Sequence, residues 1–174
     1  MSVIMDLFRQ SRKRSKDFSD SDFWEIIDSI DHEYGGDSEA VLSSLVRHLK
    51  TCEDEYIFAF EDKLSELMYS LDGKAWADGL FKGEPFAEEL FLCARCAAIA
   101  QGMNHYSQVV GHRAELTADN IHEYKGRYYG VADGLLTAAS DAWARKHLME
   151  VDKYPHTPKY PMKSHSNKAM WGEE

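Results

Sequence analysis

Residues 85–112, PFAEELFLCARCAAIAQGMNHYSQVVGH, form the most apolar long stretch of the chain. At 100° per residue, the apolar side chains fall on two faces of a helix rather than on one. The first face carries Leu92, Cys96, Ile99, Met103, Tyr106 and Val110, and the second carries Phe86, Leu90, Cys93, Ala97 and Ala100. A helix that is apolar on two faces is buried, so we expect a central helix from Phe86 to His112, beginning after Pro85.

Helical periodicity also marks the segments on both sides of this stretch. Before it, we expect helices from Asp22 to Gly35-Gly36, over residues 37–51 and 53–71, and a short one around Trp76. Asp22 is the expected N-cap of the first helix, with Glu25 completing a capping box. After it, we expect one long helix over residues 118–147. No stretch alternates convincingly like a β-strand, so the expected fold class is all-α, a single domain of five or six helices.

The expected organisation has three parts. Residues 1–18 form a basic N-terminal arm, residues 19–147 an all-helical domain, and residues 148–174 an extended tail, because three X-Pro steps there prevent a continuing helix. The apolar side chains of the tail predict that it lies back across the domain; the alternative is a recognition segment that folds on a partner. Gly126, Gly130 and Gly134 recur at intervals of four, which we interpret as a close-packing groove, the alternative being a helix break.

Charge is distributed unevenly along the chain. Residues 1–16 carry five basic side chains against one acidic one, whereas residues 17–147 carry 11 Lys and Arg against 25 Asp and Glu, a balance of −14. A core this acidic repels nucleic acid, since neutralisation of phosphate supplies most non-specific affinity. No apolar run is long enough for a membrane span. The balance indicates a basic protein partner, or else it serves only solubility.

The cysteines do not indicate a disulfide framework. Their number, three, is odd, and Cys93 and Cys96 lie one helical turn apart. His105 and His112 point away from both cysteines on a straight helix, so one helix cannot surround a zinc ion with all four side chains. We expect reduced core thiols, no metal and no other cofactor. A cytoplasmic location is expected because the N-terminus lacks the order of a secretory signal.

Several short motifs follow one another in a distinctive order. They are Phe23-Trp24-Glu25-Ile26-Ile27-Asp28, the aliphatic segment ending in Leu49, Phe60-Glu61 through Leu64 to Leu67, Trp76, and Ala94-Arg95 through Ile99-Ala100-Gln101-Gly102 to Tyr106. In this order they resemble a bacterial family catalogued as domain of unknown function 4240, sometimes found beside WGR modules. The likeness covers residues 22–145. The connection GLFKGEPFAEEL departs from the glycine- and acid-rich connection of the family. The resemblance implies an all-helical fold and brings no established activity.

Two groups of polar residues are candidate binding residues. On the central helix, Arg95, Gln101 and His105 are candidates for a polar pocket; the alternatives are a buried salt bridge for Arg95 and solvent exposure for the other two. The acidic candidates, expected to form a surface for a partner, are Glu53, Asp54, Glu55, Glu61 and Asp62. No GxSxG nucleophile and no phosphate-binding glycine loop occurs in the chain, and no residue is assigned a catalytic role.

These observations favour a non-catalytic, cytoplasmic protein-binding module. Its sharpest version is an immunity protein that neutralises a bacterial toxin by covering a basic active-site surface with acidic side chains, because complementary charge speeds encounter and restricts partners. The alternative is an enzyme or a small-ligand sensor, which requires a pocket around Arg95, Gln101 and His105.

Overall fold

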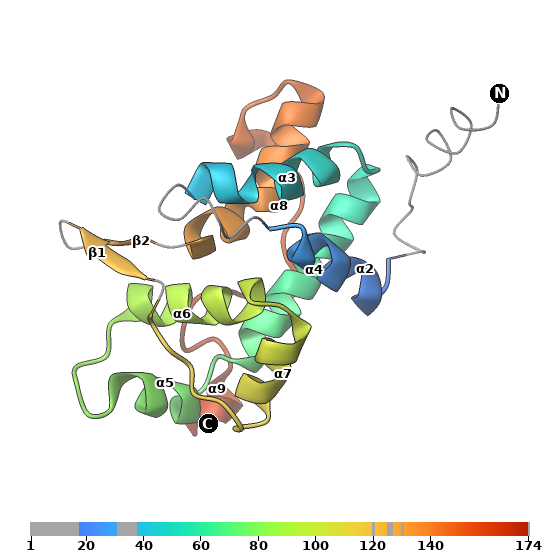
Figure 1. Cartoon of the computed structure of the whole chain (residues 1–174). Coiled ribbons are helices and arrows are strands. Elements are labelled where there is room, and N and C mark those ends of the chain that lie inside the picture. The colour runs from blue at the N-terminus through green and yellow to red at the C-terminus, as the bar shows by residue number, and fades with distance from the viewer. Residues whose placement is uncertain (1–17, 31–37, 120, 125–126, 130, 174) are drawn as a thin grey trace.

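The structure is a computed structural model that describes residues 18–30, 38–119, 121–124, 127–129 and 131–173 (Figure 1). Over these ranges the chain forms eight α-helices, one 3-10 helix and a small hairpin, which confirms the all-helical class. The helices are α2 (Asp20–Asp28), α3 (Ser38–Lys50), α4 (Asp54–Ser70), α5 (Lys74–Phe81), α6 (Glu88–Ala100), α7 (Met103–Val110), α8 (Val131–His147) and α9 (Lys168–Trp171). The hairpin consists of β1 (His122–Tyr124) and β2 (Arg127–Tyr129), and the 3-10 helix is η2 (Val151–Lys153). Helices exceed the expected five or six because the central helix divides and the tail adds α9.

The first helix begins earlier than expected. Ser19, not Asp22, is its N-cap: the Asp22 N–H donates to Ser19 Oγ (3.2 Å), and the Ser19 N–H donates to Asp22 Oδ2 (3.0 Å). This is a capping box in which Asp22 takes the third helical position. α2 ends at Asp28, and the expected end at Gly35-Gly36 lies outside the described residues.

The central helix exists, but its expected extent is wrong. α6 ends at Ala100, and α7 begins at Met103 in another direction (Figure 1). Between them Gly102 has a φ of 92° and a ψ of 171°, a positive-φ conformation that glycine adopts at little cost and that other residues rarely adopt. Periodicity missed this break because the apolar positions of the second helix continue in phase with those of the first.

The long helix expected over residues 118–147 is wrong in its first half. There, β1 and β2 pair antiparallel with Tyr124 opposite Arg127, and α8 begins only at Val131. Tyrosines in both strands favour extended backbone, and two intervening residues are the commonest length of a hairpin connection. Gly126 and Gly130 lie outside the described residues. The close-packing interpretation therefore falls outside the described residues, and of the three glycines only Gly134 lies within α8.

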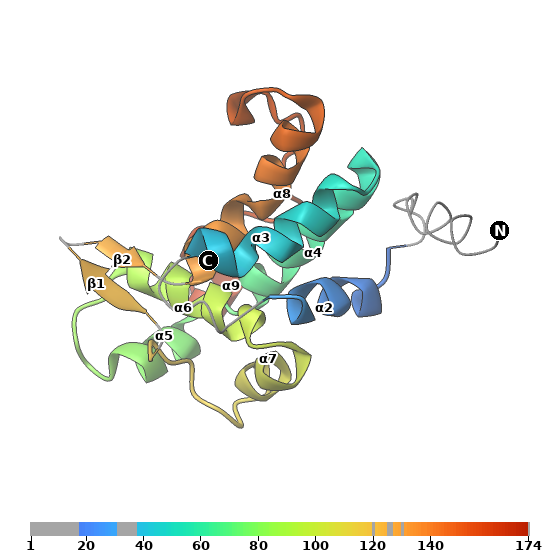
Figure 2. The same ribbon diagram turned by 45° about the horizontal axis from the view of Figure 1, so that its top comes forward.

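The core forms where α8 packs against α3, α4 and α6 (Figures 1 and 2). On α8, Ala138, Ala139 and Ala142 are buried, and α6 contributes Ala94 and Ala98. These small side chains let helix backbones approach closely while the larger residues of α3 and α4 fill the remaining space. Buried alanines thus occur on both helices of the α6–α8 contact.

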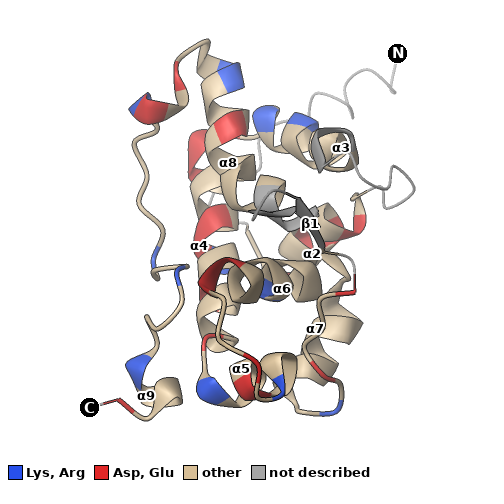
Figure 3. Ribbon diagram, turned by 90° about the vertical axis from the view of Figure 1, so that its left-hand side faces the viewer, with Lys and Arg blue, Asp and Glu red and all other residues tan. Residues whose placement is uncertain are grey.

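The tail lies back across the domain, as expected. It runs beside α4 and in the same direction, since the Tyr160 N–H donates to Ser65 Oγ (3.2 Å) and, further along both segments, the His165 N–H donates to Asp72 Oδ1 (3.0 Å). Figure 3 shows it as a separate strand of chain beside α4 that ends in α9. The tail thereby covers one side of a helix whose acidic residues were expected to face a partner.

Candidate functional site

A groove with a volume of about 460 Å³ lies between α2 and the junction of α6 with α7. Its lining consists of one side of α2 and of the turn that divides the central helix. The lining residues are Asp20, Ser21, Trp24, Glu25, Asp28, Gln101, Gly102, Met103 and Asn104. We call it the acidic groove. It brings together the first and the last of the sequence motifs, which are far apart in the chain.

Trp24 forms the apolar wall of the acidic groove. It is 8% exposed, and its ring centroid lies 5.1 Å from that of Phe23 and 5.5 Å from that of Tyr106. The Tyr106 hydroxyl donates a hydrogen bond to the Leu67 carbonyl oxygen (3.0 Å), which ties α7 to α4. Core contacts therefore hold this wall in place before any ligand arrives, and less conformational entropy is lost on binding.

Gly102 lets the two sides of the acidic groove approach each other. A Cβ atom at this position would lie 3.3 Å from Asp28 Oδ1, closer than most side-chain contacts allow. The carboxylate of Asp28 therefore lies near the N-terminal end of α7, where unpaired backbone amides favour negative charge. A side chain at position 102 would strain the backbone and require the Asp28 carboxylate to shift slightly.

The electrostatic character of the acidic groove is negative. Among the described residues that line it, three are carboxylates and none is basic. Lys63 neutralises Asp20 across 2.9 Å, but within the described part of the chain neither Glu25 nor Asp28 has an ion-pair partner. Both are exposed. The groove therefore offers two free carboxylates beside an apolar wall, which suits a basic side chain with an aliphatic stem.

The polar rim of the acidic groove comes from the end of α6 and the start of α7. Gln101 is exposed, and its Nε2 donates to the Ala97 carbonyl oxygen (3.3 Å), which leaves its amide oxygen facing solvent or ligand. Met103 is 52% exposed, and Asn104 lies beside it. These side chains can accept or donate hydrogen bonds and provide adaptable apolar contact. They present no nucleophile and base in hydrogen-bond reach of one another.

Arg95 is a structural residue under the tail. It is 0% exposed, and its guanidinium donates to the Met68 carbonyl (3.1 Å), the Met162 carbonyl (3.0 Å) and Ser164 Oγ (3.2 Å). Burial lowers the pKa of Arg95, and the negative charge of Asp72 opposes this shift. Arg95 thus joins α4 to the tail and is turned away from ligands.

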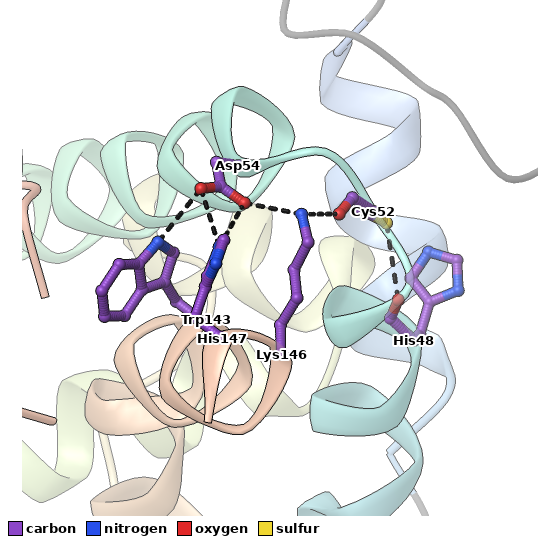
Figure 4. Close-up of polar contacts among 6 residues, drawn as sticks. All are labelled: His48, Cys52, Asp54, Trp143, Lys146 and His147. Carbon is purple, nitrogen blue, oxygen red and sulfur yellow. Dashed lines mark hydrogen bonds and ion pairs between the residues drawn. The ribbon is translucent and has the colours of Figure 1, made fainter. Parts of the chain in front are cut away.

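Asp54 is the centre of a polar cluster between the start of α4 and the end of α8 (Figure 4). Its carboxylate accepts hydrogen bonds from Trp143 Nε1 (3.1 Å) and Lys146 Nζ (2.6 Å), and His147 Nε2 lies 2.9 Å from it. Burial raises the pKa of Asp54, but the hydrogen bonds from Lys146 and His147 outweigh burial and hold the pKa below its ordinary value. Asp54 therefore has a structural role, because it joins the start of α4 to the end of α8.

Glu61 and Asp62 lie beneath the tail. Glu61 is 7% exposed and accepts a hydrogen bond from the Tyr154 hydroxyl (3.0 Å); burial raises its pKa, and this bond opposes the shift. Asp62 accepts a bond from the Lys159 N–H (2.8 Å). The expectation that Glu61 faces outward is wrong, because helical periodicity reports which face is polar and does not report what covers it.

The eight candidate residues are therefore not brought together into one site. Gln101 lines the acidic groove, whereas Arg95 is enclosed and His105 is half-buried outside the lining. Glu53 and Glu55 flank Asp54 at the start of α4, half-buried and exposed respectively. The polar pocket around Arg95, Gln101 and His105 that an enzyme would need does not form.

The carboxylates of the acidic groove were not among the candidates. Glu25 appeared only as a helix cap, and Asp28 only as part of a motif. A signal was nevertheless present in the sequence, since both belong to the first family-like motif and Gln101-Gly102 belongs to the last. Placing the two motifs together requires the direction of α7, which depends on the turn at Gly102.

The thiols of the central helix are core residues. Cys93 and Cys96 form no disulfide and are buried within α6, and Cys96 Sγ lies 3.6 Å from Met68 Sδ. Among the residues that the structure describes, no three His, Cys, Asp or Glu side chains gather as metal ligands would. Nor does any described helix combine the length and apolar character needed to cross a membrane.

Comparison with known proteins gives one match. A family model with the description "Protein of unknown function (DUF4240)" covers residues 19–145. No curated protein and no solved structure matches the chain. The matched range includes the whole lining of the acidic groove and ends before the tail.

Proposed function

The chain belongs to the DUF4240 family, and from this membership and the acidic groove we propose that it is a non-catalytic protein-binding module for a basic partner. One observation carries the proposal. Two stretches that carried the family resemblance, Trp24 to Asp28 and Gln101-Gly102, meet in a groove with two free carboxylates and a fixed aromatic wall. A Lys or Arg side chain of a partner fits such a groove, its charge at Glu25 and Asp28 and its stem along Trp24.

Charge outside the groove supports the encounter with such a partner. The formal net charge is −10, and acidic residues occur on α2, α4, α5 and the connecting segments (Figure 3). A field of one sign raises the association rate of an oppositely charged protein and weakens with salt. Affinity then depends on the groove, and the rate of encounter on the whole surface.

An immunity protein is the specific form of this proposal. Such a protein would act in the cytoplasm and cover the basic active-site surface of a toxin. Glu55 would contribute at a second point, because it adjoins the Asp54 cluster that holds the end of α8, where Leu148 is exposed. Leu148 is 92% exposed and would meet an apolar part of the partner's surface.

The proposal is tested by affinity capture from the native host with matched variants. The groove variant is Glu25→Gln/Asp28→Asn, and the control is Glu89→Gln/Glu150→Gln, which removes two exposed charges elsewhere. We expect the full chain to retain one stoichiometric basic protein in low salt and less of it in moderate salt. The groove variant should bind that protein about tenfold more weakly, and the control within about twofold.

Two results would contradict the proposal: no stoichiometric partner in either salt condition, or equal weakening by the groove and control variants. If the partner is a toxin, the immunity form predicts that co-expression of the full chain restores growth and that the groove variant does so poorly. A partner without toxicity would remove the immunity form and leave the binding module.

A further inference from the structure

A second cleft lies at the other end of the molecule, between α5, the connection that follows it and α9. Its volume is about 410 Å³, within the range of about 300–1,000 Å³ that small-molecule sites occupy. The lining residues are Lys74, Ala77, Asp78, Phe81, Gly83, Glu84, Phe86, His165, Trp171 and Glu173. We call it the aromatic cleft. We propose that it binds a quaternary ammonium group, independently of the acidic groove.

Aromatic rings form two walls of this cleft that stand nearly perpendicular to each other. His165 and Trp171 stack with centroids 3.6 Å apart, and the ring of Phe86 stands at 79° to the first and 87° to the second. Phe81 meets Phe86 from the α5 side, with centroids 5.2 Å apart. Phe86 is 42% exposed. All four rings line the cleft, and the face of an aromatic ring attracts a cation through its quadrupole.

The aromatic walls are anchored to the core. Trp171 Nε1 donates a hydrogen bond to Asp72 Oδ1 (2.8 Å), and this buried carboxylate also accepts bonds from the N–H groups of Ser166 (2.7 Å) and Asn167 (2.9 Å). Gly73 allows α9 to lie close, since a Cβ there would be 2.8 Å from Met170 Cβ. The indole is therefore held in one orientation, and donation toward a carboxylate polarises it in the sense that favours a cation.

The charged residues that line the aromatic cleft also favour a cationic ligand. Asp78 is paired with Lys74 (2.6 Å), and Glu173 lies 3.2 Å from His165 Nδ1. Glu84 has no ion-pair partner within the described part of the chain. With the first pair neutral, the remaining carboxylates give the lining a negative excess. A purely apolar ligand would make no use of that charge, whereas a cation with methyl groups uses both the rings and the carboxylates.

A quaternary ammonium ion fits better than a primary ammonium ion. A primary ammonium is strongly hydrated and needs three hydrogen-bond acceptors to leave water. A quaternary ammonium carries no N–H group and presents apolar methyl groups to the rings, so its desolvation costs less. Free choline-like molecules and trimethyllysine side chains share this chemistry.

Titration calorimetry with the full chain tests the proposal. The probes are choline, its neutral carbon isostere dimethylbutanol, and a short peptide containing trimethyllysine beside the same peptide with unmodified lysine. We expect choline or the methylated peptide to bind, and its neutral or unmodified counterpart to bind at least about fivefold more weakly. Tighter binding of choline would indicate a free small molecule as the ligand, and tighter binding of the methylated peptide a protein side chain.

Substitutions inside and outside the aromatic cleft test whether the cation binds there. Phe86→Leu and Glu84→Gln should each weaken binding by about three- to tenfold, whereas Glu89→Gln, a matched loss of an exposed carboxylate outside the cleft, should not. Because Phe86 and Glu84 are exposed, neither substitution opens the core. No binding of either cation up to about 10 mM, equal binding of dimethylbutanol and choline, or binding unaffected by both cleft variants would overturn the proposal.

Discussion

The carboxylates under the tail and those in the acidic groove have the same chemistry and opposite uses. Glu61, Asp62 and Asp72 each accept hydrogen bonds from the tail, and Asp72 is fully buried. Glu25 and Asp28 stand exposed, without ion-pair partners in the described ranges. The first group holds the chain together and the second is free for a ligand.

This difference shows why the number of acidic residues in a sequence overestimates the number of carboxylates that a partner can reach. A buried carboxylate that accepts several hydrogen bonds has exchanged water for protein donors, and no partner can use it. An exposed carboxylate contributes little to stability and remains available. The balance of −14 over residues 17–147 includes both kinds, so the acidic surface that is open to any partner is smaller than this balance suggests.

The largest expected effect is at Asp72. Asp72→Ala removes the acceptor of four bonds, from the N–H groups of His165, Ser166 and Asn167 and from the Trp171 indole. We expect a loss of about 3 kcal/mol in the free energy of unfolding, measured by urea denaturation, and faster proteolysis of the tail. The control is Asp152→Ala on η2, whose carboxylate is exposed. Equal losses in both variants would show that the tail does not depend on this carboxylate.

The structure around the acidic groove should depend on the backbone conformation of Gly102 rather than on hydrogen bonds to a buried carboxylate. Gly102→Ala forces a side chain into a left-handed conformation beside Asp28, so we expect a loss of about 1–2 kcal/mol. Gly79→Ala is the matched control, because Gly79 lies within α5 and has open space where the Cβ would be. It should leave stability unchanged or raise it by up to about 1 kcal/mol. A harmless Gly102→Ala would contradict the close approach of α2 and α7.

Substitution of Asp54 should have a smaller effect on stability, and the size of this effect should depend on pH. Asp54→Asn should cost about 1 kcal/mol near neutral pH, because Lys146 loses its ion pair. The pKa of Asp54 is lowered by folding, so this stabilisation is complete above the ordinary value of 3.8 and disappears as the pH falls through the lowered pKa. Thermal unfolding of both proteins between neutral pH and about pH 3 measures it. A difference that persists undiminished at the acidic end would exclude the carboxylate charge as its source.

Substitution of Glu61 should change the free energy of unfolding least, and it should raise stability at neutral pH rather than lower it. Burial raises its pKa, so at neutral pH the ionised form costs stability, which returns as the pH falls through the raised pKa toward the ordinary value of 4.5. Glu61→Gln still accepts the bond from Tyr154 and removes the charge. We expect a gain of about 0.5 kcal/mol near neutral pH that vanishes near pH 4, measured by thermal unfolding. A clear loss at neutral pH would mean that the charge itself is stabilising.

Local patterns predicted most helices because each is amphipathic over several turns. The stripes at Phe23, at Val41 to Leu49 and at Ile57 to Leu71 are buried where expected. The predictions of secondary structure are wrong at two places, a turn made by a single glycine and a very short hairpin. Gly102 turns the chain although the apolar positions on both sides stay in phase, and the short hairpin of β1 and β2 contains too few residues for a period of two to be recognised.

Candidate sites were harder to predict because they depend on segments far apart in sequence. Arg95 is buried, as the alternative of a buried salt bridge expected, but its guanidinium donates to uncharged acceptors, of which Met162 and Ser164 are about 70 residues away. Glu61 has a polar surface pattern and a buried position because the tail crosses it. The acidic groove required the direction of α7, which no periodicity contains.

The course of the tail beside α4 has a consequence for biosynthesis. Chains emerge from the ribosome N-terminus first, and domains begin to fold as they emerge. Residues 154–171 are made after α8, yet they supply the donors for Asp72 and the acceptors for Arg95. Until they arrive, Asp72 after α4 and Arg95 in α6 lack the tail residues that complete their native burial. The helical bundle thus reaches its final packing only after synthesis has passed the tail.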